Sequence, residues 1–360
     1  MRVAIDGSSR QGRKTGIGVY TENLLGALRT AEPDIDIFEL NDGADANQRT
    51  DRRIWREQFA LPRLARQASA DILHLPGFAA PARASCPVVL TVHDLIGVLF
   101  ARDFPPVARF YWSRWLPFTL RFPNILIANS EHTRKDVINL VGVPPDRIRV
   151  VYPGRDERFR PIADREELAQ VRAEMNLPEP FLLFVGTLEP RKGVDTLIRA
   201  FARLASEILD SLVIVGKRGW YWEQTLALVD RLGLGRRIRL LDYVPDGTLP
   251  LLYNLAHAFV FPSRYEGFGL PVLEAMASGV PVVSSNAASL PEIVGDAGLL
   301  FPPDNVDALS HAIVRIVGDA GLRASLRECG LRQARRFDWT VSAHETAQVY
   351  RETYERASRT

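Results

Sequence analysis

The sequence is poor in cysteine and in long apolar runs. Its two cysteines, Cys86 and Cys329, lie far apart and form neither a CxxC pair nor a disulfide framework, so we expect a reducing compartment. The most apolar stretch, residues 88–100, is interrupted by His93 and Asp94 and is too short to span about 30 Å of hydrocarbon. We therefore expect no membrane-spanning helix and a cytoplasmic location.

Net charge is also small. The sequence has 45 Lys and Arg residues against 43 Asp and Glu residues, a net charge of +2. This excess is not gathered into a long basic tract of the kind that follows a nucleic acid backbone, so we expect no nucleic acid partner. Asp6 stands where a secretory signal would need its apolar centre, so no signal peptide is expected.

The length indicates two domains. Single hydrophobic cores stop growing at about 250–300 residues, and this chain has 360. Short β-rich apolar runs alternate with amphipathic helical patterns, which is typical of parallel sheets covered by helices on both faces. In the first half these patterns predict strands over residues 2–5, 35–40, 72–75, 88–92, 125–128 and 148–151, and helices over 18–30 and 131–140, the second capped through Asn129 and Ser130.

The second half repeats this scheme. Residues 152–161 between the halves carry prolines near both ends and are too charged for a strand, so they are interpreted as a linker. A last helix is expected over residues 340–356. The other elements predicted here are strands over residues 181–185, 211–215, 238–241, 258–261 and 280–284, and helices near 194–205, 222–232, 249–255, 271–278 and 306–317.

The strongest local motif is an acidic, glycine-rich turn between a predicted strand and a predicted helix that has Pro271 at its first position. Its glycines allow backbone N–H groups to approach an anion in front of the helix dipole, so a phosphate would fit there. Glu274, expected in the first turn of the helix, can accept hydrogen bonds from a diol such as a ribose. Alternatively, Glu274 only complements the helix dipole and the glycines only turn the chain. The expected contact residues of the turn are Glu266, Gly267, Phe268, Gly269 and Leu270.

A second motif is basic. The buried strand predicted at residues 181–185 is followed by GTLEPRKG, which brings Arg191 and Lys192 to its carboxyl end. Ligands of open α/β sheets bind outside the carboxyl ends of the strands, so these cations are candidates for phosphate binding. By itself, an Arg-Lys pair is more often a solvated face.

Two features of the first half are weaker. Gly16 and Gly18 come late in the loop after the first strand and do not form a dinucleotide fingerprint; they indicate only a close backbone approach. His93 follows the strand predicted at residues 88–92, where it could bind a sugar hydroxyl or support positive charge at a reacting carbon. A structural histidine satisfied by Asp94 or by a loop is an equally good interpretation.

Residues 100–122 interleave aromatic residues with arginines. One interpretation is a basic, aromatic surface that contacts the inner membrane and presents a lipid-linked acceptor. The other is an amphipathic core helix whose arginines extend outward. Asp34 and Asp36 have a D-x-D spacing but lie where a strand begins, so we expect no metal site there.

Together these residues resemble the retaining nucleotide-sugar glycosyltransferases of the GT-B fold, and within them glycosyltransferase family 4. The most specific part is the pair of glutamates separated by seven residues, which falls on Glu266 and Glu274 within EGFGLPVLEAMASGVPVV. Also similar are GTLEPRKG, TVHDL, the early TGIGVY loop, and FDW followed by a helix. The resemblance implies an α/β protein with two facing Rossmann-like domains and an interdomain cleft. We assign residues 1–155 with the C-terminal helix 339–360 to an acceptor-side domain, and residues 160–338 to a nucleotide-sugar domain.

The resemblance also implies roles for single residues. Many family members have an arginine directly after the strand glycine, where this chain has Thr187, so we assign the guanidinium role to Arg191. The other expected donor contacts are Gly16, Gly18, Thr187, Tyr243 and Val244. The implied roles are diphosphate binding for Lys192, ribose binding for Glu274, contact with the donor sugar for Glu266, and a position near the reacting carbon for His93.

The expected activity is transfer of a sugar, with retention of anomeric configuration, from a nucleotide diphosphate to a glycan or lipid-linked saccharide acceptor. GDP-mannose is the donor we expect from similarity to bacterial mannosyltransferases that build surface polysaccharide. No resident cofactor or metal is expected, because Arg191 and Lys192 would neutralise the leaving diphosphate. Two alternatives are a nucleotide-sugar epimerase of the same fold and a non-catalytic sugar-binding protein.

Overall fold

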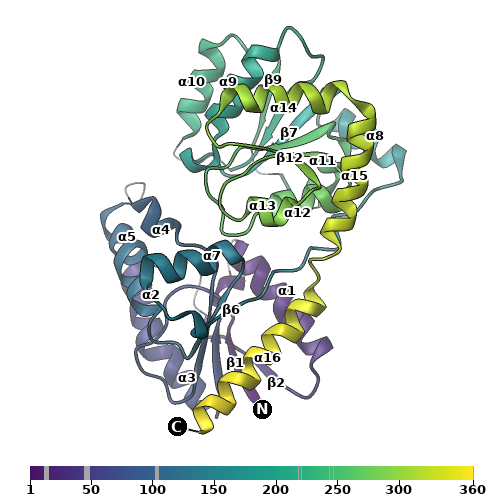
Figure 1. The fold of residues 1–360 in the computed structure, drawn as a ribbon. Helices are drawn as coiled ribbons and strands as arrows, with labels where there is room; N and C mark the ends of the chain where they lie inside the picture. Colours follow the sequence, from purple (N-terminus) through teal and green to yellow (C-terminus); the bar gives the residue numbers. More distant parts are fainter. Residues whose placement is uncertain are drawn as a thin grey trace. The chain divides into compact units, whose positions relative to one another are not determined.

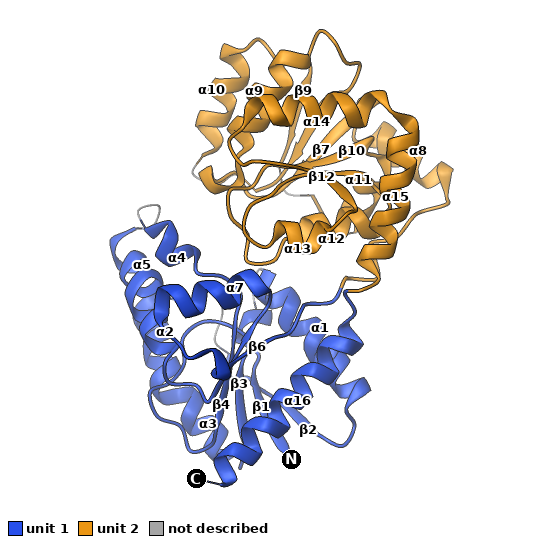
Figure 2. Cartoon of the chain, in the orientation of Figure 1, with its two compact units in different colours: residues 1–154, 337–360 blue, residues 155–336 orange. Residues whose placement is uncertain are grey.

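The computed structural model describes residues 1–11, 16–43, 49–101, 105–217, 219, 221–242, 244–245 and 247–359. The chain divides into two compact units (Figures 1 and 2). Unit 1 contains Met1–Gly154 and Phe337–Thr360, and unit 2 contains Arg155–Arg336. Within the described residues, each unit holds a six-stranded parallel sheet, which confirms the α/β class expected from the alternation of strands and helices.

The sheet of unit 1 has the strand order β2-β1-β3-β4-β5-β6. Alternate residues of its strands face two different cores, as the period of two in a β-strand requires. Ala4 and Leu126 join a core with α3 (Leu61–Gln67) and the π-helical turn Val137–Val141, whereas Val3 and Ile125 join a core with α1 (Gly16–Ala31) and α16 (Trp339–Ser358). The strands are β1 (Arg2–Asp6), β2 (Asp36–Leu40), β3 (Ile72–Leu75), β4 (Val88–Val92), β5 (Ile125–Ala128) and β6 (Ile148–Val150).

The helices of unit 1 include the last helix of the chain, α16 (Trp339–Ser358), which packs against α1 (Gly16–Ala31) (Figure 1). Helix α7 begins as predicted, because Ser130 Oγ accepts a hydrogen bond from the Thr133 N–H at 3.0 Å. The remaining segments are α2 (Thr50–Trp55), a π-helical turn (Arg56–Ala60), α3 (Leu61–Gln67), α4 (Ile96–Leu99), α5 (Pro106–Phe110), a π-helical turn (Tyr111–Trp115), α6 (Leu116–Thr119), α7 (Glu131–Asp136) and a π-helical turn (Val137–Val141), with 3-10 turns at Ser8–Arg10 and Pro145–Arg147.

The sheet of unit 2 has the order β12-β11-β10-β7-β8-β9. Its two central strands are buried at every position but one, as expected for a parallel sheet covered on both faces. The strands are β7 (Phe181–Val185), β8 (Ser211–Val215), β9 (Ile238–Leu241), β10 (Ala258–Phe261), β11 (Val282–Ser285) and β12 (Gly298–Phe301). The helices are α8 (Arg165–Glu174), α9 (Val194–Leu204), α10 (Trp222–Arg231), α11 (Leu249–Leu255), α12 (Leu270–Ala277), α13 (Leu290–Val294), α14 (Val306–Gly318) and α15 (Ala320–Ala334).

Four elements of unit 2, namely α8, α13, α15 and β12, are absent from the sequence-based prediction. Helix α8 buries none of its residues, and α15 buries only Leu326, Gly330 and Ala334, so neither shows a clear apolar stripe. Strand β12 lies at the edge of the sheet and exposes Leu300. Helix α13 is only five residues long, and the exposed positions of the other three elements weaken their apolar pattern in the sequence.

Candidate active site

The strand order of unit 2 creates a topological switch point between β7 and β10. From β7 the chain moves outward to β8 and β9, and it then returns to the other side of β7 for β10, β11 and β12. Ligands of doubly wound sheets bind at the carboxyl ends of the strands at such a point. The basic segment 186–193 follows β7 and the acidic segment 262–269 follows β10, so both segments lie at this switch point.

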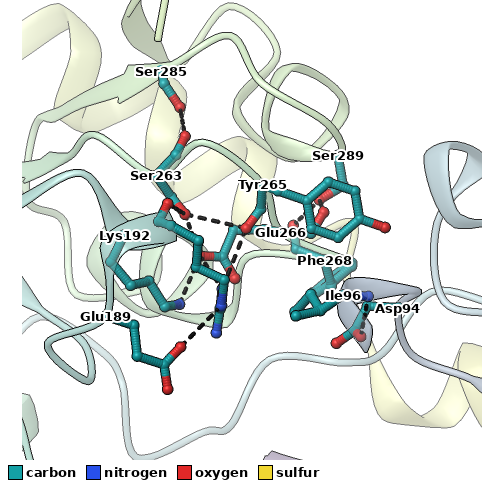
Figure 3. Close-up of polar contacts among 11 residues, drawn as sticks. Asp94, Ile96, Glu189, Lys192, Ser263, Tyr265, Glu266, Phe268, Ser285 and Ser289 are labelled. Carbon is teal, nitrogen blue, oxygen red and sulfur yellow. Dashed lines mark hydrogen bonds and ion pairs between the residues drawn. The ribbon is translucent and has the colours of Figure 1, made fainter. Parts of the chain in front are cut away.

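The side chains of these two segments meet at one carboxylate (Figure 3). Lys192 Nζ donates a hydrogen bond to Glu266 Oε1 at 2.6 Å, and Arg191 Nη1 lies 3.4 Å from the same oxygen. Arg191 Nε also donates to Glu189 Oε2 at 3.0 Å. Lys192 ends the 3-10 turn Pro190–Lys192, and both Lys192 and Glu266 are buried. The fold therefore gathers two cations and a carboxylate at the switch point.

Burial and charge act in opposite directions on this cluster. Burial lowers the pKa of Lys192 below its ordinary value, although the carboxylate of Glu266 opposes the shift. Burial alone would raise the pKa of Glu266, but the cations Lys192 and Arg191 hold it below its ordinary value. Glu266 is thus a carboxylate at neutral pH, and the cations beside it can bind a second anion such as a diphosphate.

Three serines that the sequence analysis did not single out hold the acidic turn. Ser263 Oγ donates to Glu266 Oε1 at 2.6 Å, and Ser289 Oγ lies 2.9 Å from the carbonyl of Glu266 and 2.6 Å from that of Phe268 (Figure 3). Ser285, at the end of β11, donates to the Ser263 carbonyl. All three are buried. The position of each serine after a strand was visible in the sequence, but its bonding partner was not.

The glycines allow close approaches between backbone segments. Gly193 has φ +66°, and a Cβ there would lie 2.2 Å from the carbonyl oxygen of Pro262, so the two strand-end segments abut. Gly269 has φ +114° and forms the N-cap of α12. Helix α12 therefore begins at Leu270, and Pro271 is its second residue rather than its first. A proline fits there as well, because helical N–H groups in the first turn have no intrahelical partner.

Glu274 corrects a second expectation. Because α12 begins at Leu270, Glu274 is the fifth residue of the helix and does not lie in its first turn. Its Oε2 accepts a hydrogen bond from the fully buried Tyr253 hydroxyl at 3.0 Å, and burial, together with this carboxylate, raises the pKa of Tyr253. The bond fixes one oxygen of the Glu274 carboxylate. Glu274 therefore does more than complement the dipole of the helix.

The other expected donor contacts are distributed around this edge of the sheet. Thr187 lies between β7 and the 3-10 turn, where its methyl group would be 3.3 Å from a Cβ at Gly219. Val244 is half-buried and follows β9. Tyr243 lies outside the described residues. No hydrogen bond joins Thr187 or Val244 to the Glu266 cluster within the part of the chain that the structure describes.

In unit 1, His93 follows β4 and is held by a loop. Its Nε2 donates to the Pro76 carbonyl at 2.6 Å, and Tyr20 packs edge-on against the ring with centroids 4.7 Å apart. Burial lowers the pKa of His93 to about 4, so the ring is neutral at pH 7. With Nε2 protonated, Nδ1 is a hydrogen-bond acceptor. Asp94 does not hold the ring; its Oδ1 accepts the Ile96 N–H at 3.0 Å.

The glycines near the start of α1 and the D-x-D spacing are also in unit 1. Gly16 is the first residue of α1, and a Cβ there would meet nothing within 4 Å, so packing does not require a glycine. Gly18 is buried in the first turn. Asp36 begins β2 and pairs with Arg2 at 3.1 Å, so it belongs to the amino-end edge of the sheet.

Known families and relatives match most of the chain. A model of "Glycosyltransferase Family 4" matches residues 14–159, and one of "Glycosyl transferases group 1" matches residues 165–333. The chain is 38% identical over 283 residues to O-antigen chain mannosyltransferase B of Escherichia coli, which covers 78% of this chain and 74% of that protein. It is 31% identical over 264 residues to the serotype-specific mannosyltransferase WbdA of Escherichia coli, covering 71% of this chain but only 32% of WbdA.

The fold is shared with a solved structure. The crystal structure of Anabaena HepE in complex with UDP-glucose aligns with a TM-score of 0.76 and 20% identity, covering 98% of this chain and all of that chain. Two such parallel sheets, together with the family matches, define a GT-B glycosyltransferase, an enzyme of the hexosyltransferase class. The chain belongs to glycosyltransferase family 4.

Proposed function

We propose that this enzyme is a retaining mannosyltransferase that moves mannose from GDP-mannose to a glycan or lipid-linked saccharide. The observation that carries this proposal is the meeting of Arg191, Lys192 and Glu266 at the switch point of unit 2. As the glycosidic bond to the diphosphate breaks, negative charge grows on the leaving oxygen. Preorganised cations stabilise such charge by several kcal/mol in a site that excludes water.

The remaining roles follow from position and chemistry. Glu266, fixed by Ser263, contacts hydroxyl groups of the donor sugar, and the N–H groups around Gly267 and Gly269 bind phosphate oxygens in front of α12. Glu274, whose carboxylate is held by the Tyr253 hydroxyl, binds the ribose diol. His93 of unit 1 accepts a hydroxyl hydrogen at Nδ1 near the reacting carbon.

We assign retention to a front-face reaction in which the departing diphosphate takes the proton of the acceptor hydroxyl. Glu266 is engaged by two cations and by Ser263, an arrangement that suits binding better than nucleophilic attack. Arg191 and Lys192 provide the charge that a divalent cation would otherwise supply, so transfer is expected to need no metal. Chelation with EDTA should then leave the rate unchanged.

Support for mannose comes from the two relatives, whose names describe mannosyltransferases, one of the O-antigen chain. A surface polysaccharide is accordingly the acceptor class we propose. The chain spans about a third of the length of WbdA.

A direct test mixes the purified chain with GDP-mannose, UDP-glucose or UDP-GlcNAc, with and without a mannose-containing oligosaccharide. We expect mannose transfer from GDP-mannose only when the acceptor is present. NMR of the product should show that the new linkage keeps the anomeric configuration of the donor. An inverted linkage would overturn retention. Interconversion of UDP-GlcNAc with an isomer in the absence of acceptor would identify an epimerase, and binding without turnover a sugar-binding protein.

A membrane contact is the second part of the proposal. In the described part of the chain, no helix is both long and apolar enough to cross a bilayer. The aromatic side chains of residues 105–122 differ in exposure. Tyr111 is buried, whereas Phe110 and Phe118 are exposed. Arg102 and Phe104 lie outside the described residues.

Exposed aromatic side chains also occur on α2 and on the π-helical turn that follows it. Trp55 is 61% exposed and Phe59 is 64% exposed, and Arg109 and Arg114 are exposed on the other segment. Aromatic groups among cations suit an anionic lipid surface, which would place the enzyme at the cytoplasmic face of the membrane. Cosedimentation with phosphatidylglycerol vesicles should fall in Trp55→Ser/Phe59→Ser, and equal binding by the wild type and this variant would contradict the contact.

A further inference from the structure

Arg264 forms hydrogen bonds with three segments around the candidate site. Its Nη2 donates to both carboxylate oxygens of Asp195 at 3.1 Å, and its Nε donates to Asp304 Oδ1 at 2.6 Å. Its Nη1 donates to the carbonyl oxygen of Pro190. These partners lie in the basic segment after β7, in the first turn of α9 and in the segment after β12. One side chain thus links the ends of β7, β10 and β12.

The backbone of Arg264 strengthens this link. Its N–H donates to the Arg191 carbonyl at 2.7 Å, a main-chain hydrogen bond between the acidic segment and the basic segment. The Ser263 hydroxyl reaches the same carbonyl at 3.2 Å, and Gly193 abuts Pro262 nearby. The cations therefore lie on a segment that is attached to the acidic segment immediately before Glu266.

This attachment matters because, among the described residues, the main-chain bonds from the basic segment toward β8 extend only to Leu188. Residues 186–193 contain only the 3-10 turn Pro190–Lys192, and residues 262–269 contain no helix or strand. Charge-assisted and bidentate hydrogen bonds from an arginine fix direction as well as distance. A displacement of about 1 Å at a catalytic group can lower a rate by about 100-fold, so the spacing between Lys192 and Glu266 needs such a constraint.

We propose that Arg264 is a positioning residue that sets the spacing of Arg191 and Lys192 relative to Glu266 through its bonds to Pro190, Asp195 and Asp304. Within the described residues, its side chain bonds to neither Lys192 nor Glu266, so it acts on them only through the backbone segments that carry them. The inference rests on the proposed function in that these cations bind the donor diphosphate.

The test compares Arg264→Met with Arg237→Met. Arg237 is a matched control because it also donates to three partners in unit 2, the carbonyls of Ala205, Ile208 and Asp210. These carbonyls precede β8, at the amino ends of the strands, whereas Arg264 lies at the carboxyl ends. The probes are inorganic pyrophosphate and GDP, titrated by calorimetry, followed by KM and kcat with GDP-mannose.

We expect Arg264→Met to weaken pyrophosphate binding by about 10-fold or more and to lower kcat, whereas Arg237→Met binds within about 2-fold of the wild type at a similar melting temperature. Combined with Lys192→Met, the Arg264 change should add little further loss, because both act through the same cation. Asp304→Asn keeps the bond to Asp195, so it should weaken pyrophosphate binding less; it also serves if Arg264→Met does not fold.

Two outcomes separate this inference from the proposed function. If Lys192→Met loses pyrophosphate binding while Arg264→Met and Asp304→Asn match Arg237→Met, the positioning role is wrong and the donor site stands. If Lys192→Met binds pyrophosphate and GDP as well as the wild type, the donor site is wrong and the positioning role falls with it.

Discussion

Lys192 and Glu266 are 74 residues apart in sequence, yet Nζ of the one lies 2.6 Å from Oε1 of the other in a buried position. A buried ion pair loses hydration on both sides and is strongly destabilised when one partner is removed. In the chain without ligand each side chain neutralises the other. A diphosphate would offer Lys192 new oxygen partners and leave the carboxylate of Glu266 for the sugar.

Glu266→Gln should separate donor binding from transfer. Removing the carboxylate charge leaves Lys192 and Arg191 available to an anion, so pyrophosphate affinity should rise by about 10-fold. Transfer should fall by at least about 100-fold, because the contact with the sugar is weakened. Calorimetry and steady-state kinetics measure the two effects. Glu189→Gln is the control, since the Glu189 side chain bonds to Arg191 at 3.0 Å but, within the described residues, forms no hydrogen bond with the Lys192 side chain. A parallel loss of binding and transfer in Glu266→Gln would indicate a structural role.

Lys192→Met should lower both binding and transfer. The substitution keeps most of the apolar stem but removes the cation, so we expect at least about a 100-fold loss of transfer, with KM for the donor raised. Lys217→Met is the control, because Lys217 follows β8, one strand farther from β10. Near-normal transfer by the Lys192 variant would remove this residue from the mechanism.

Tyr253→Phe should weaken binding of the nucleoside part of the donor but not of its phosphates. Loss of the hydroxyl removes the hydrogen bond that holds Glu274 Oε2 and weakens the positioning of the carboxylate. GDP binding is therefore expected to weaken about 5- to 10-fold, within the range of one ordinary hydrogen bond, while pyrophosphate binding stays the same. Calorimetric titrations with both ligands measure the difference, with Tyr354→Phe on the exposed part of α16 as the control. Equal weakening for both ligands would argue against a ribose contact.

Glu57→Gln should change how stability depends on pH. Burial raises the pKa of Glu57 to about 8 from 4.5, although bonds from Tyr111 and Ala79 oppose the shift. Between these values the folded chain keeps a proton that the unfolded chain has lost, so stability falls as pH rises, by up to about 1.4 kcal/mol per pH unit. The Glu57→Gln variant does not lose stability in this way. Its free energy of unfolding, relative to that of the wild type, should therefore rise from pH 5 to pH 8.

Urea unfolding at pH 5, 6.5 and 8 measures this gain. Glu131→Gln, at an exposed position of α7 in the same unit, should keep the pH dependence of the wild type. Parallel pH profiles for the wild type and Glu57→Gln would show that Glu57 ionises alike in the folded and unfolded chains.

Sequence patterns could predict the elements that are buried on both faces. Residues 181–185 are a continuous apolar run, and the strand found there has the predicted bounds. The edge strand Gly298–Phe301 and the polar helix Arg165–Glu174 were missed, because partial exposure weakens the apolar pattern. The convergence of Lys192 with Glu266 was predictable for a related reason: the carboxyl ends of parallel strands share one edge of a sheet.

The sequence alone determined the α/β class, the family and the two segments that carry the donor-site candidates, because these depend on periodicity and on motifs of adjacent residues. Only the tertiary structure decided which side chains hold those candidates in place. Tyr253 bonds to Glu274, Ser289 to the turn after Glu266, and Arg264 to Asp304, and each pair lies 21 to 40 residues apart. Such contacts depend on the packing of whole strands and helices, which leaves no local pattern at either residue.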